Sequence, residues 1–176
     1  MPKKPIDLIV ALDKNNGIGK DGAIPWRIPE DLKRFAQITS TTVDPDKQNA
    51  VIMGRKTWES IPEKFRPLPN RLNLVLTLGN TEFPGAIAVH SFHGAINLVE
   101  HTTKIERVFV IGGAKVYKRA MRHAENIYVT ALDIEVVCDV FFPVIGTEFE
   151  LSSWDAPHNH CGIEFEYLRY RRIVRV

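Results

Sequence analysis

Short apolar runs alternate with segments of helical periodicity over the first two thirds of the chain. The runs are rich in β-branched residues and lack a two-residue alternation of polarity, which is typical of strands buried on both faces. We predict such strands at residues 6–12, 50–53, 72–78, 86–89 and 107–111. Because strands that alternate with helices are joined by crossover connections, this pattern predicts an α/β fold with a mostly parallel sheet.

Four helices are predicted between these strands, over residues 29–39, 55–61, 92–100 and 114–123. Pro29 suits the first position of the first helix, Pro62 ends the second, and Ser91 can cap the third. The apolar residues at helical spacing in the first helix are Leu32, Phe35 and Ala36. The apolar face of the last helix comprises Val116, Tyr117, Ala120 and Met121.

The last third of the chain changes to strands alone. A strand is predicted at 127–134, and segments 149–154 and 163–176 are expected to form an antiparallel hairpin that completes the sheet. The apolar residues of the last segment change phase at Tyr167–Leu168, which predicts a β-bulge there. Four arginines in this segment suggest either a nucleic-acid patch or, as we favour, charges that protect an edge strand: Arg169, Arg171, Arg172 and Arg175.

The composition predicts one globular domain over residues 1–176, with 44% hydrophobic residues and a net charge of +2. This charge gives no general reason to expect nucleic-acid or membrane binding. Cys138 and Cys161 are too few for a disulfide framework and are expected to be reduced, as in a cytoplasmic protein. The apolar run at 6–12 is too short and too polar for a signal peptide or membrane span, so we expect a soluble protein. With no extended apolar surface stripe unassigned, we expect a monomer.

A glycine-rich loop joins the first strand to the first helix. Its segment 17–22 matches G-x-G-x-x-G, but the strand ends near Leu12, and Pro25 and Pro29 lie where a dinucleotide-binding helix would run. We therefore reject a Rossmann fingerprint. The remaining loop can be a mobile surface segment. It can also be a lid that closes over a ligand, because Ile24, Pro25 and Trp26 are large and apolar.

Asp31 is the most informative single residue of the sequence. It lies on the apolar side of the predicted first helix, one turn before Phe35. An acid in the first turn can simply complement the helix dipole, but Glu30 already does so on a less apolar face. A carboxylate directed toward a core or cleft needs a partner, and a heterocycle with an amidine-like N–H/NH₂ edge would provide one.

Two strand-to-helix junctions have the chemistry of phosphate sites. Gly112 and Gly113 allow a ligand to approach the backbone closely, although they are equally compatible with a tight turn of unusual peptide conformation. At the second junction, Gly54 precedes Arg55, Lys56 and Thr57. Two cations at a helix start oppose the dipole, so they favour an additional phosphate over a merely solvated turn.

Other chemistries have little support. His158, His160 and Cys161 lie close together, but no second cluster completes a four-ligand metal site, so we expect no metal. No serine or cysteine has the context of a nucleophile elbow, which leaves hydrolysis by a catalytic triad unsupported.

Several segments, taken in order, resemble the dihydrofolate reductase family. They lie at residues 9–12 (IVAL), 17–19 (GIG), 24–26 (IPW), 29–32 (PEDL) with Phe35, 51–62 (VIMGRKTWESIP), 66–71 (RPLPNR), 110–117 (VIGGAKVY) and 139–143 (DVFFP). The resemblance covers nearly the whole chain, and the length without a fused domain resembles the bacterial monofunctional type. It implies an eight-stranded, mostly parallel sheet with four helices. It also implies reduction of dihydrofolate to tetrahydrofolate by NADPH, in support of one-carbon metabolism and thymidylate synthesis.

The resemblance also implies substrate contacts. Asp31 would be the catalytic acid that holds the amino-pyrimidine edge and favours protonation of the neighbouring ring nitrogen, with Thr130 supporting its carboxylate. Arg71 would clamp the glutamate carboxylate, and Arg66 would lie nearby at the mouth. The pocket would be lined by Ile9, Ala11, Leu32, Phe35, Ile61 and Leu68, with Ile111 at the edge of the reaction centre.

For NADPH, the resemblance implies three groups of contacts. The nicotinamide end would meet Ala11 and the lid residues Gly17, Ile18, Gly19, Lys20, Asp21, Gly22, Ala23 and Trp26. The pyrophosphate and ribose would lie against Ile111, Gly112, Gly113, Ala114, Lys115, Val116 and Tyr117. The phosphates and the adenine side would be held by Gly54, Arg55, Lys56, Thr57, Thr77 and His90.

The chain departs from the family pattern in three places. Ile24 replaces a common lid methionine, Cys138 replaces a common glycine in the loop that braces the lid, and Leu78 replaces a polar residue that His90 can compensate for. Two other functions remain open. A related reductase acting on a pyrimidine of riboflavin synthesis would have no use for Arg71. A nucleotide- or RNA-binding module would bind through phosphates and weaken steeply with salt.

Overall fold

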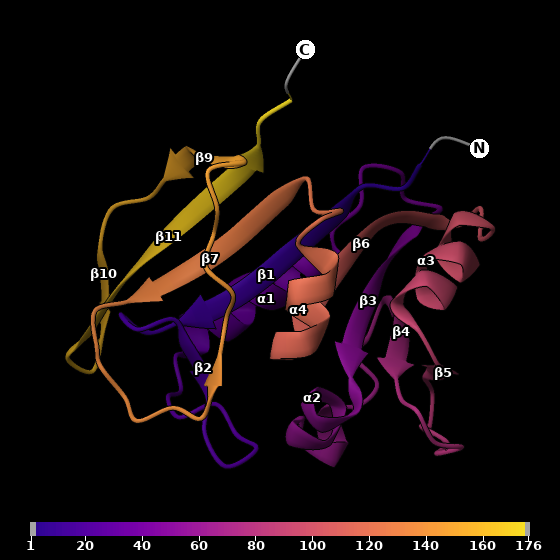
Figure 1. The fold of residues 1–176 in the computed structure, drawn as a ribbon, viewed down its shortest axis with the longest axis horizontal. Helices are drawn as coiled ribbons and strands as arrows, with labels where there is room; N and C mark the ends of the chain where they lie inside the picture. The colour runs from indigo at the N-terminus through magenta and orange to yellow at the C-terminus, as the bar shows by residue number, and fades with distance from the viewer. Residues whose placement is uncertain (1–2, 175–176) are drawn as a thin grey trace.

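The computed structural model describes residues 3–174 and contains one main sheet of nine strands. The strands are β1 (Ile6–Leu12), β3 (Gln48–Gly54), β4 (Arg71–Leu76), β5 (Ile87–Val89), β6 (Ile105–Gly112), β7 (Asn126–Leu132), β9 (Phe149–Trp154), β10 (His158–His160) and β11 (Ile163–Arg172). Eight of them form the order β10-β11-β7-β1-β6-β3-β4-β5, and β9 pairs with β11 (Figure 1). The strands from β7 to β5 are parallel, whereas β11 runs antiparallel to β7, β9 and β10. The predicted mostly parallel sheet with an antiparallel C-terminal pairing is therefore confirmed.

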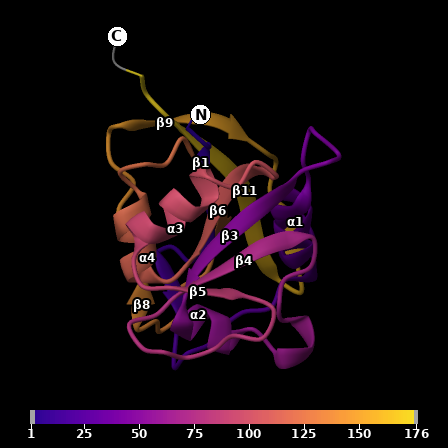
Figure 2. The same ribbon diagram turned by 90° about the vertical axis from the view of Figure 1, so that its right-hand side faces the viewer.

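Four α-helices cover the two faces of this sheet. They are α1 (Pro29–Ser40), α2 (Arg55–Ser60), α3 (Phe92–Glu100) and α4 (Ala114–Ala120), with a 3-10 turn η1 (Glu63–Phe65) after α2. Figure 2 shows α1 on one side of the sheet and α3 and α4 on the other. The cap of α3 is as predicted, since the Ser91 hydroxyl oxygen accepts a hydrogen bond from the Gly94 N–H at 2.9 Å. Within residues 3–174, no helix combines the length and apolar character that a membrane span requires.

Strand β1 shows why the apolar runs lack alternation. Ile6, Leu8 and Val10 pack in the core on the α3 and α4 side, whereas Ile9 packs in the core on the α1 side. Every position of such a strand faces a protein layer, so polar residues have no solvent-exposed face to occupy.

The orientation of α1 differs from the prediction. Leu32 is 52% exposed, and Ala36 is also exposed. Phe35 packs toward the sheet as predicted, but its companions are Ile38 and the buried Thr39. Polar residues occupy this face because they have partners: the Thr39 hydroxyl accepts a hydrogen bond from Arg71, and Asp31 accepts one from Thr130.

Two interpretations of the last strand were wrong. β11 pairs with β7 without interruption from Phe165 to Arg171, and the register shift lies instead in its pairing with β9, between Arg169 and Tyr170. The apolar phase changes because the strand serves two cores: Phe165 and Tyr167 pack on the α1 side, and Leu168 and Tyr170 pack on the α3 and α4 side.

β11 is also an interior strand, so its arginines do not protect an edge. Arg169 donates to the Asn126 side-chain oxygen, Arg171 pairs with Glu150 at 3.1 Å, and Arg172 donates to the Ala124 carbonyl oxygen. Arg175 lies outside the described residues. These side chains are held by intramolecular partners rather than gathered as a free basic patch.

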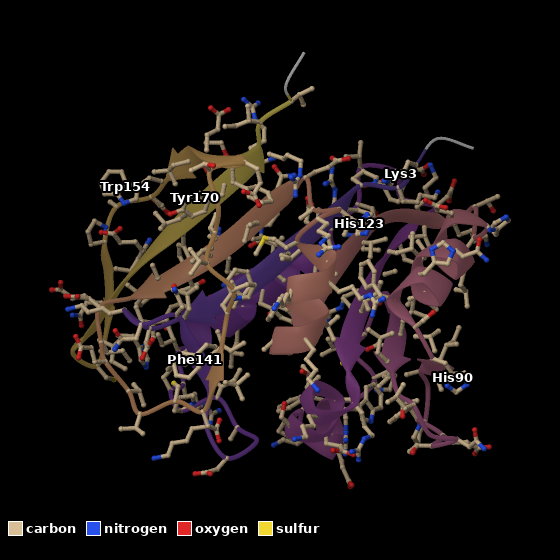
Figure 3. All side chains as sticks on the ribbon, in the orientation of Figure 1. Lys3, His90, His123, Phe141, Trp154 and Tyr170 are labelled. Carbon is tan, nitrogen blue, oxygen red and sulfur yellow. The ribbon has the colours of Figure 1, made fainter. Side chains whose placement is uncertain are left out.

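A second, two-stranded sheet was not predicted. It consists of β2 (Gly17–Gly19) and β8 (Val140–Phe141), the latter marked by Phe141 in Figure 3. Asp13, only 1% exposed, braces it. Its Oδ1 accepts hydrogen bonds from the N–H groups of Asn15 (2.9 Å) and Gly17 (2.7 Å), and its Oδ2 accepts one from the Val136 N–H (3.0 Å). One buried carboxylate thus joins the base of the glycine-rich loop to the segment that leads into β8.

Candidate active site

The candidate site lies where the carboxyl ends of β1, β6 and β3 meet. The chain leaves β1 toward α1 on one face of the sheet, and it leaves the neighbouring β6 toward α4 on the other face. Such a divergence is the usual position of a ligand site in α/β sheets.

Asp31 lies beside this point, in the first turn of α1. Its side chain is half-buried, and its Oδ1 accepts a hydrogen bond from the Thr130 hydroxyl of β7 at 2.5 Å. Burial raises the pKa of Asp31 above its ordinary value, while the Thr130 hydrogen bond and the positive charge of Arg34 oppose this rise. The carboxylate is therefore fixed in direction, and its second oxygen can accept from an N–H donor of a ligand.

Most of the predicted pocket residues lie together on the α1 side of the sheet. Ile9, Phe35, Ile61, Leu68 and Ile111 come from five different segments and belong to one apolar cluster. Ala11 packs in the adjoining cluster with Trp26. The exposed Leu32 adds apolar surface beside Asp31, which suits the flat, uncharged part of a ligand.

Arg71 lies at the other end of this apolar surface. It is 8% exposed, and its guanidinium donates to the Thr39 hydroxyl at 2.6 Å and to the Pro69 carbonyl at 2.9 Å. Thr39 follows Asp31 by eight residues on α1, which corresponds to about 12 Å along a helix. The site therefore places an acid near one end of an apolar face and a cation near the other, next to helix residues that are about 12 Å apart.

Arg66 is close to this region but is engaged with α2. Its guanidinium donates to the Trp58 carbonyl oxygen at 3.1 Å and lies 5.4 Å from the centre of the Trp58 ring. Glu63 is a further partner at 3.5 Å.

The two predicted phosphate junctions meet at the ends of adjacent strands. Met53 is the register partner of Gly112, and a Cβ atom on Gly112 would approach the Thr57 hydroxyl oxygen to 3.0 Å. Gly112 has a φ of +139°, and its peptide bond to Gly113 is cis, as the unusual conformation considered above allows. Next to them, Tyr117 donates its hydroxyl to the Ile9 carbonyl oxygen at 2.8 Å, which ties α4 to β1. The remaining predicted residues of this segment, Ala114, Lys115 and Val116, form the first turn of α4.

The cations of the second junction point to solvent. Lys56 is exposed, and Arg55 pairs with Glu59 within α2 at 2.9 Å. Gly54 approaches Gly113, since a Cβ atom there would lie 3.7 Å from the Gly113 nitrogen. The glycines at these junctions thus allow a phosphate to approach the backbone closely. The exposed cations are accessible to the same phosphate.

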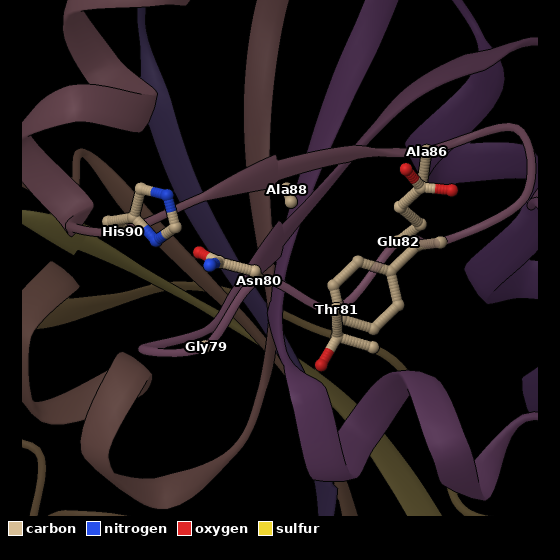
Figure 4. Close-up of a pocket in the computed structure, with 8 residues that line it drawn as sticks. Gly79, Asn80, Thr81, Glu82, Ala86, Ala88 and His90 are labelled. Carbon is tan, nitrogen blue, oxygen red and sulfur yellow. The ribbon is translucent and has the colours of Figure 1, made fainter.

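Thr77 and His90 lie together at the sheet edge near β5, where the His90 Nδ1 is 3.2 Å from the Thr77 carbonyl oxygen. A shallow recess of about 380 Å³ opens there, with His90 and Asn80 at one end and Glu82 and Ala86 at the other (Figure 4). A second recess of about 440 Å³ is lined by residues such as Trp58, Arg66 and Phe83. Neither recess contains Asp31 or Arg71, so the candidate site is defined by the arrangement of its side chains and not by these hollows.

The lid residues form a turn supported by β8. Lys20 and Ala23 exchange backbone hydrogen bonds of 2.9 Å, and Asp21 donates its N–H to Asp139 at 2.9 Å. Gly22 lies at the tip with a φ of +80°, and Ile18 packs in the core beneath, on the α4 side. Sequence reasoning missed the bracing by Asp13. An acid at the end of a buried strand, before Asn15, Asn16 and Gly17, is the local signal that could have indicated it.

The histidines considered for a metal have other neighbours. His160 lies 3.0 Å from Glu30, and His158 lies 3.4 Å from Asp155. Across residues 3–174, no group of three His, Cys, Asp or Glu side chains has the arrangement of a metal site.

Comparison with known proteins identifies the family. Residues 5–172 match the family model described as dihydrofolate reductase. The chain is 42% identical to bifunctional dihydrofolate reductase-thymidylate synthase 1 of Arabidopsis thaliana, across 98% of this chain and 35% of that protein. It is 40% identical to dihydrofolate reductase of Drosophila melanogaster, across 92% of this chain and 94% of that protein. The dihydrofolate reductase of Aedes albopictus is 38% identical, across 98% and 100%.

The chain spans about a third of the length of the bifunctional plant relatives that it matches. These relatives come from plants and insects, so they do not support the expectation of a bacterial type. The family match from residue 5 to residue 172 shows that this chain belongs to the dihydrofolate reductase family.

Proposed function

We propose that this protein reduces dihydrofolate to tetrahydrofolate, with NADPH as the hydride donor. The observation that carries the proposal is the pairing of the half-buried Asp31 with the buried Arg71 across one apolar face, in a chain of this family. A pterin with an aminobenzoyl-glutamate tail has the matching order of groups: N–H donors, a flat apolar middle and a carboxylate.

Each residue of the site has a task in this reaction. Asp31 would accept hydrogen bonds from the amino-pyrimidine edge and favour proton uptake at the neighbouring ring nitrogen. Thr130 fixes the Asp31 carboxylate by its hydrogen bond. Arg71, already oriented by Thr39 and Pro69, would bind the glutamate carboxylate as a rigid fork.

The cofactor assignment rests on the two junctions. NADPH supplies the hydride when it is bound. Gly112 and Gly113 would allow its pyrophosphate to approach the backbone, and Arg55, Lys56 and Thr57 would hold its phosphates. The lid at 17–26 would exclude water from the nicotinamide. The preference for the 2′-phosphorylated cofactor follows from the two adjacent cations.

The test is the loss of reduced-nicotinamide absorbance on addition of dihydrofolate. The wild-type protein should turn over, and Asp31→Asn should lose a factor of about 10² to 10⁴ in kcat. The loss should be smallest at acidic pH, where dihydrofolate is already protonated. Glu30→Gln is the matched control, because it removes the neighbouring acid of the same turn, and it should retain activity. A wild-type protein without turnover, or an unimpaired Asp31→Asn, would refute the proposal.

A further inference from the structure

Arg34 lies one turn after Asp31 on α1, where residues three apart are neighbours on a helix surface. Its side chain is half-buried, and its guanidinium carbon lies 4.1 Å from the centre of the Tyr167 ring. This distance is well within the range of a cation–π interaction. The positive charge is therefore held against the protein rather than extended into solvent.

The Tyr167 ring is in turn fixed next to the acid's own partner. Tyr167 of β11 is the register partner of Thr130 of β7, and Thr130 donates to Asp31. The ring is also packed by Phe165 at 5.5 Å and by His158 at 4.9 Å between centres. The Arg34–Tyr167 contact therefore joins α1 to β11, and the Thr130–Asp31 hydrogen bond joins β7 to α1. Because β7 and β11 are paired strands, both contacts hold the same part of α1 against the sheet.

We propose that Arg34, held on the ring of Tyr167, is a positioning residue whose fixed positive charge favours the ionised form of Asp31. The inference rests on the proposed function only for the task it gives to Asp31. An ionised Asp31 accepts N–H donors with both oxygens, whereas a protonated one presents an O–H and would lose part of this recognition. Burial opposes ionisation here, and a nearby cation favours it.

The charges around Asp31 support this assignment. Burial raises the pKa of Asp31, while the Thr130 hydrogen bond and, after it, the positive charge of Arg34 lower this pKa. The other titratable groups that face Asp31 are Tyr117 of α4 and Tyr167 of β11, whereas Tyr128 of β7 faces Arg34. Burial raises the pKa of each phenol, so they stay neutral. Glu30, the adjacent acid, pairs with His160 of β10, and Asp155 faces Arg34 from the segment after β9.

The experiment is a pH titration of the Asp31 carboxyl carbon by NMR in protein labelled at aspartate, without substrate or cofactor. The signal is assigned by its loss in Asp31→Asn. In Arg34→Met the midpoint should rise by about one pH unit, because removal of a neighbouring opposite charge raises a carboxyl pKa by that order. Lys33→Met is the matched control: it removes one positive charge from an exposed position of the same helix and should leave the midpoint unchanged.

The ring is tested separately. Tyr167→Phe keeps the aromatic face and should keep the wild-type midpoint, whereas Tyr167→Leu should release Arg34 and raise the midpoint. Arg34→Gln serves as a second neutral variant if Arg34→Met does not fold, and urea unfolding checks that each variant does.

An unchanged midpoint in folded Arg34→Met or Arg34→Gln would overturn the inference, as would an equal rise in Lys33→Met. Because the titration needs no ligand, its outcome is independent of the proposed reaction. A wild-type protein that does not consume NADPH with dihydrofolate refutes the function alone, and an active enzyme without the midpoint shift refutes the role of Arg34 alone.

Discussion

Asp13→Ala should destabilise the protein strongly, because it removes the one acceptor that three backbone N–H groups share. The carboxylate is 1% exposed and receives bonds of 2.7 Å from Gly17, 2.9 Å from Asn15 and 3.0 Å from Val136. Hydrogen bonds to a charged group contribute roughly 1.5–3 kcal/mol each. Since Asn15 is exposed and water can reach its N–H, we expect a total loss of about 3–5 kcal/mol in the free energy of unfolding. For a chain of this size that corresponds to a fall in Tm of about 10 °C.

Asp13→Asn separates the two halves of this network. Its oxygen can still accept from Asn15 and Gly17, but its NH₂ group would face the Val136 N–H, so the expected loss is about 1–3 kcal/mol. Urea unfolding followed by tryptophan fluorescence gives both values, and hydrogen exchange at Gly17 and Val136 shows where protection is lost.

Asp133→Ala is the control, since this exposed acid of the same region makes a surface ion pair with Lys14 that contributes at most about 1 kcal/mol. If Asp13→Ala and Asp13→Asn both cost less than about 1 kcal/mol, the bracing role derived from the three bonds is wrong.

Two further substitutions test the site from other directions. In Gly17→Ala the new Cβ would lie 2.5 Å from the Cys138 sulfur, so we expect a loss of about 1–3 kcal/mol in urea unfolding, most of it recovered when Cys138→Gly is added. Equal losses in the single and double variants would disprove this contact as the cause. Asp31→Asn should stabilise the protein at neutral pH. Because burial raises the folded-state pKa of Asp31, the native protein binds its proton more tightly than the unfolded chain, and stability falls as pH rises through that window. The gain in stability of Asp31→Asn should therefore vanish below pH 3.8, the ordinary pKa of the side chain. Thermal melts measured across pH test this, and a difference in Tm that is the same at every pH would contradict it.

Local signals predicted the elements well. Pro29, Ser91 and Pro62 mark helix ends through backbone chemistry that needs no distant partner, and each helix begins or ends where they indicate. The apolar runs located the parallel strands for the same reason, because burial on both faces is visible in the run itself.

Long-range pairing was beyond the reach of such signals. The sequence of α1 predicted Leu32 and Ala36 on its inner face, but Thr39 turns inward because Arg71 lies opposite it in the fold. The pairing of β2 with β8 depends on segments more than a hundred residues apart, and each strand is too short to show periodicity.

For the candidate site, the residue types were informative where chemistry is local. The residue types indicated Asp31 and the two glycine junctions, whereas Arg71 and the pocket residues came from the resemblance to the family. The structure brings the apolar residues Ile9, Phe35, Ile61, Leu68 and Ile111 together in one cluster. Their roles in binding remain proposals. Arg34 escaped notice because a cation on a helix usually belongs to a solvated face, and only the register of β11 places a tyrosine ring over it.

β11 also determines how cooperatively the protein unfolds. Its first half closes the layer on the α1 side, and its second half closes the layer on the α3 and α4 side, so detaching this single strand exposes two hydrophobic interiors at once. Neither layer retains a complete interior of its own, and partial melting of one should propagate to the other. The chain should therefore unfold in one all-or-none transition, and proteolytic removal of this strand should leave no folded half behind.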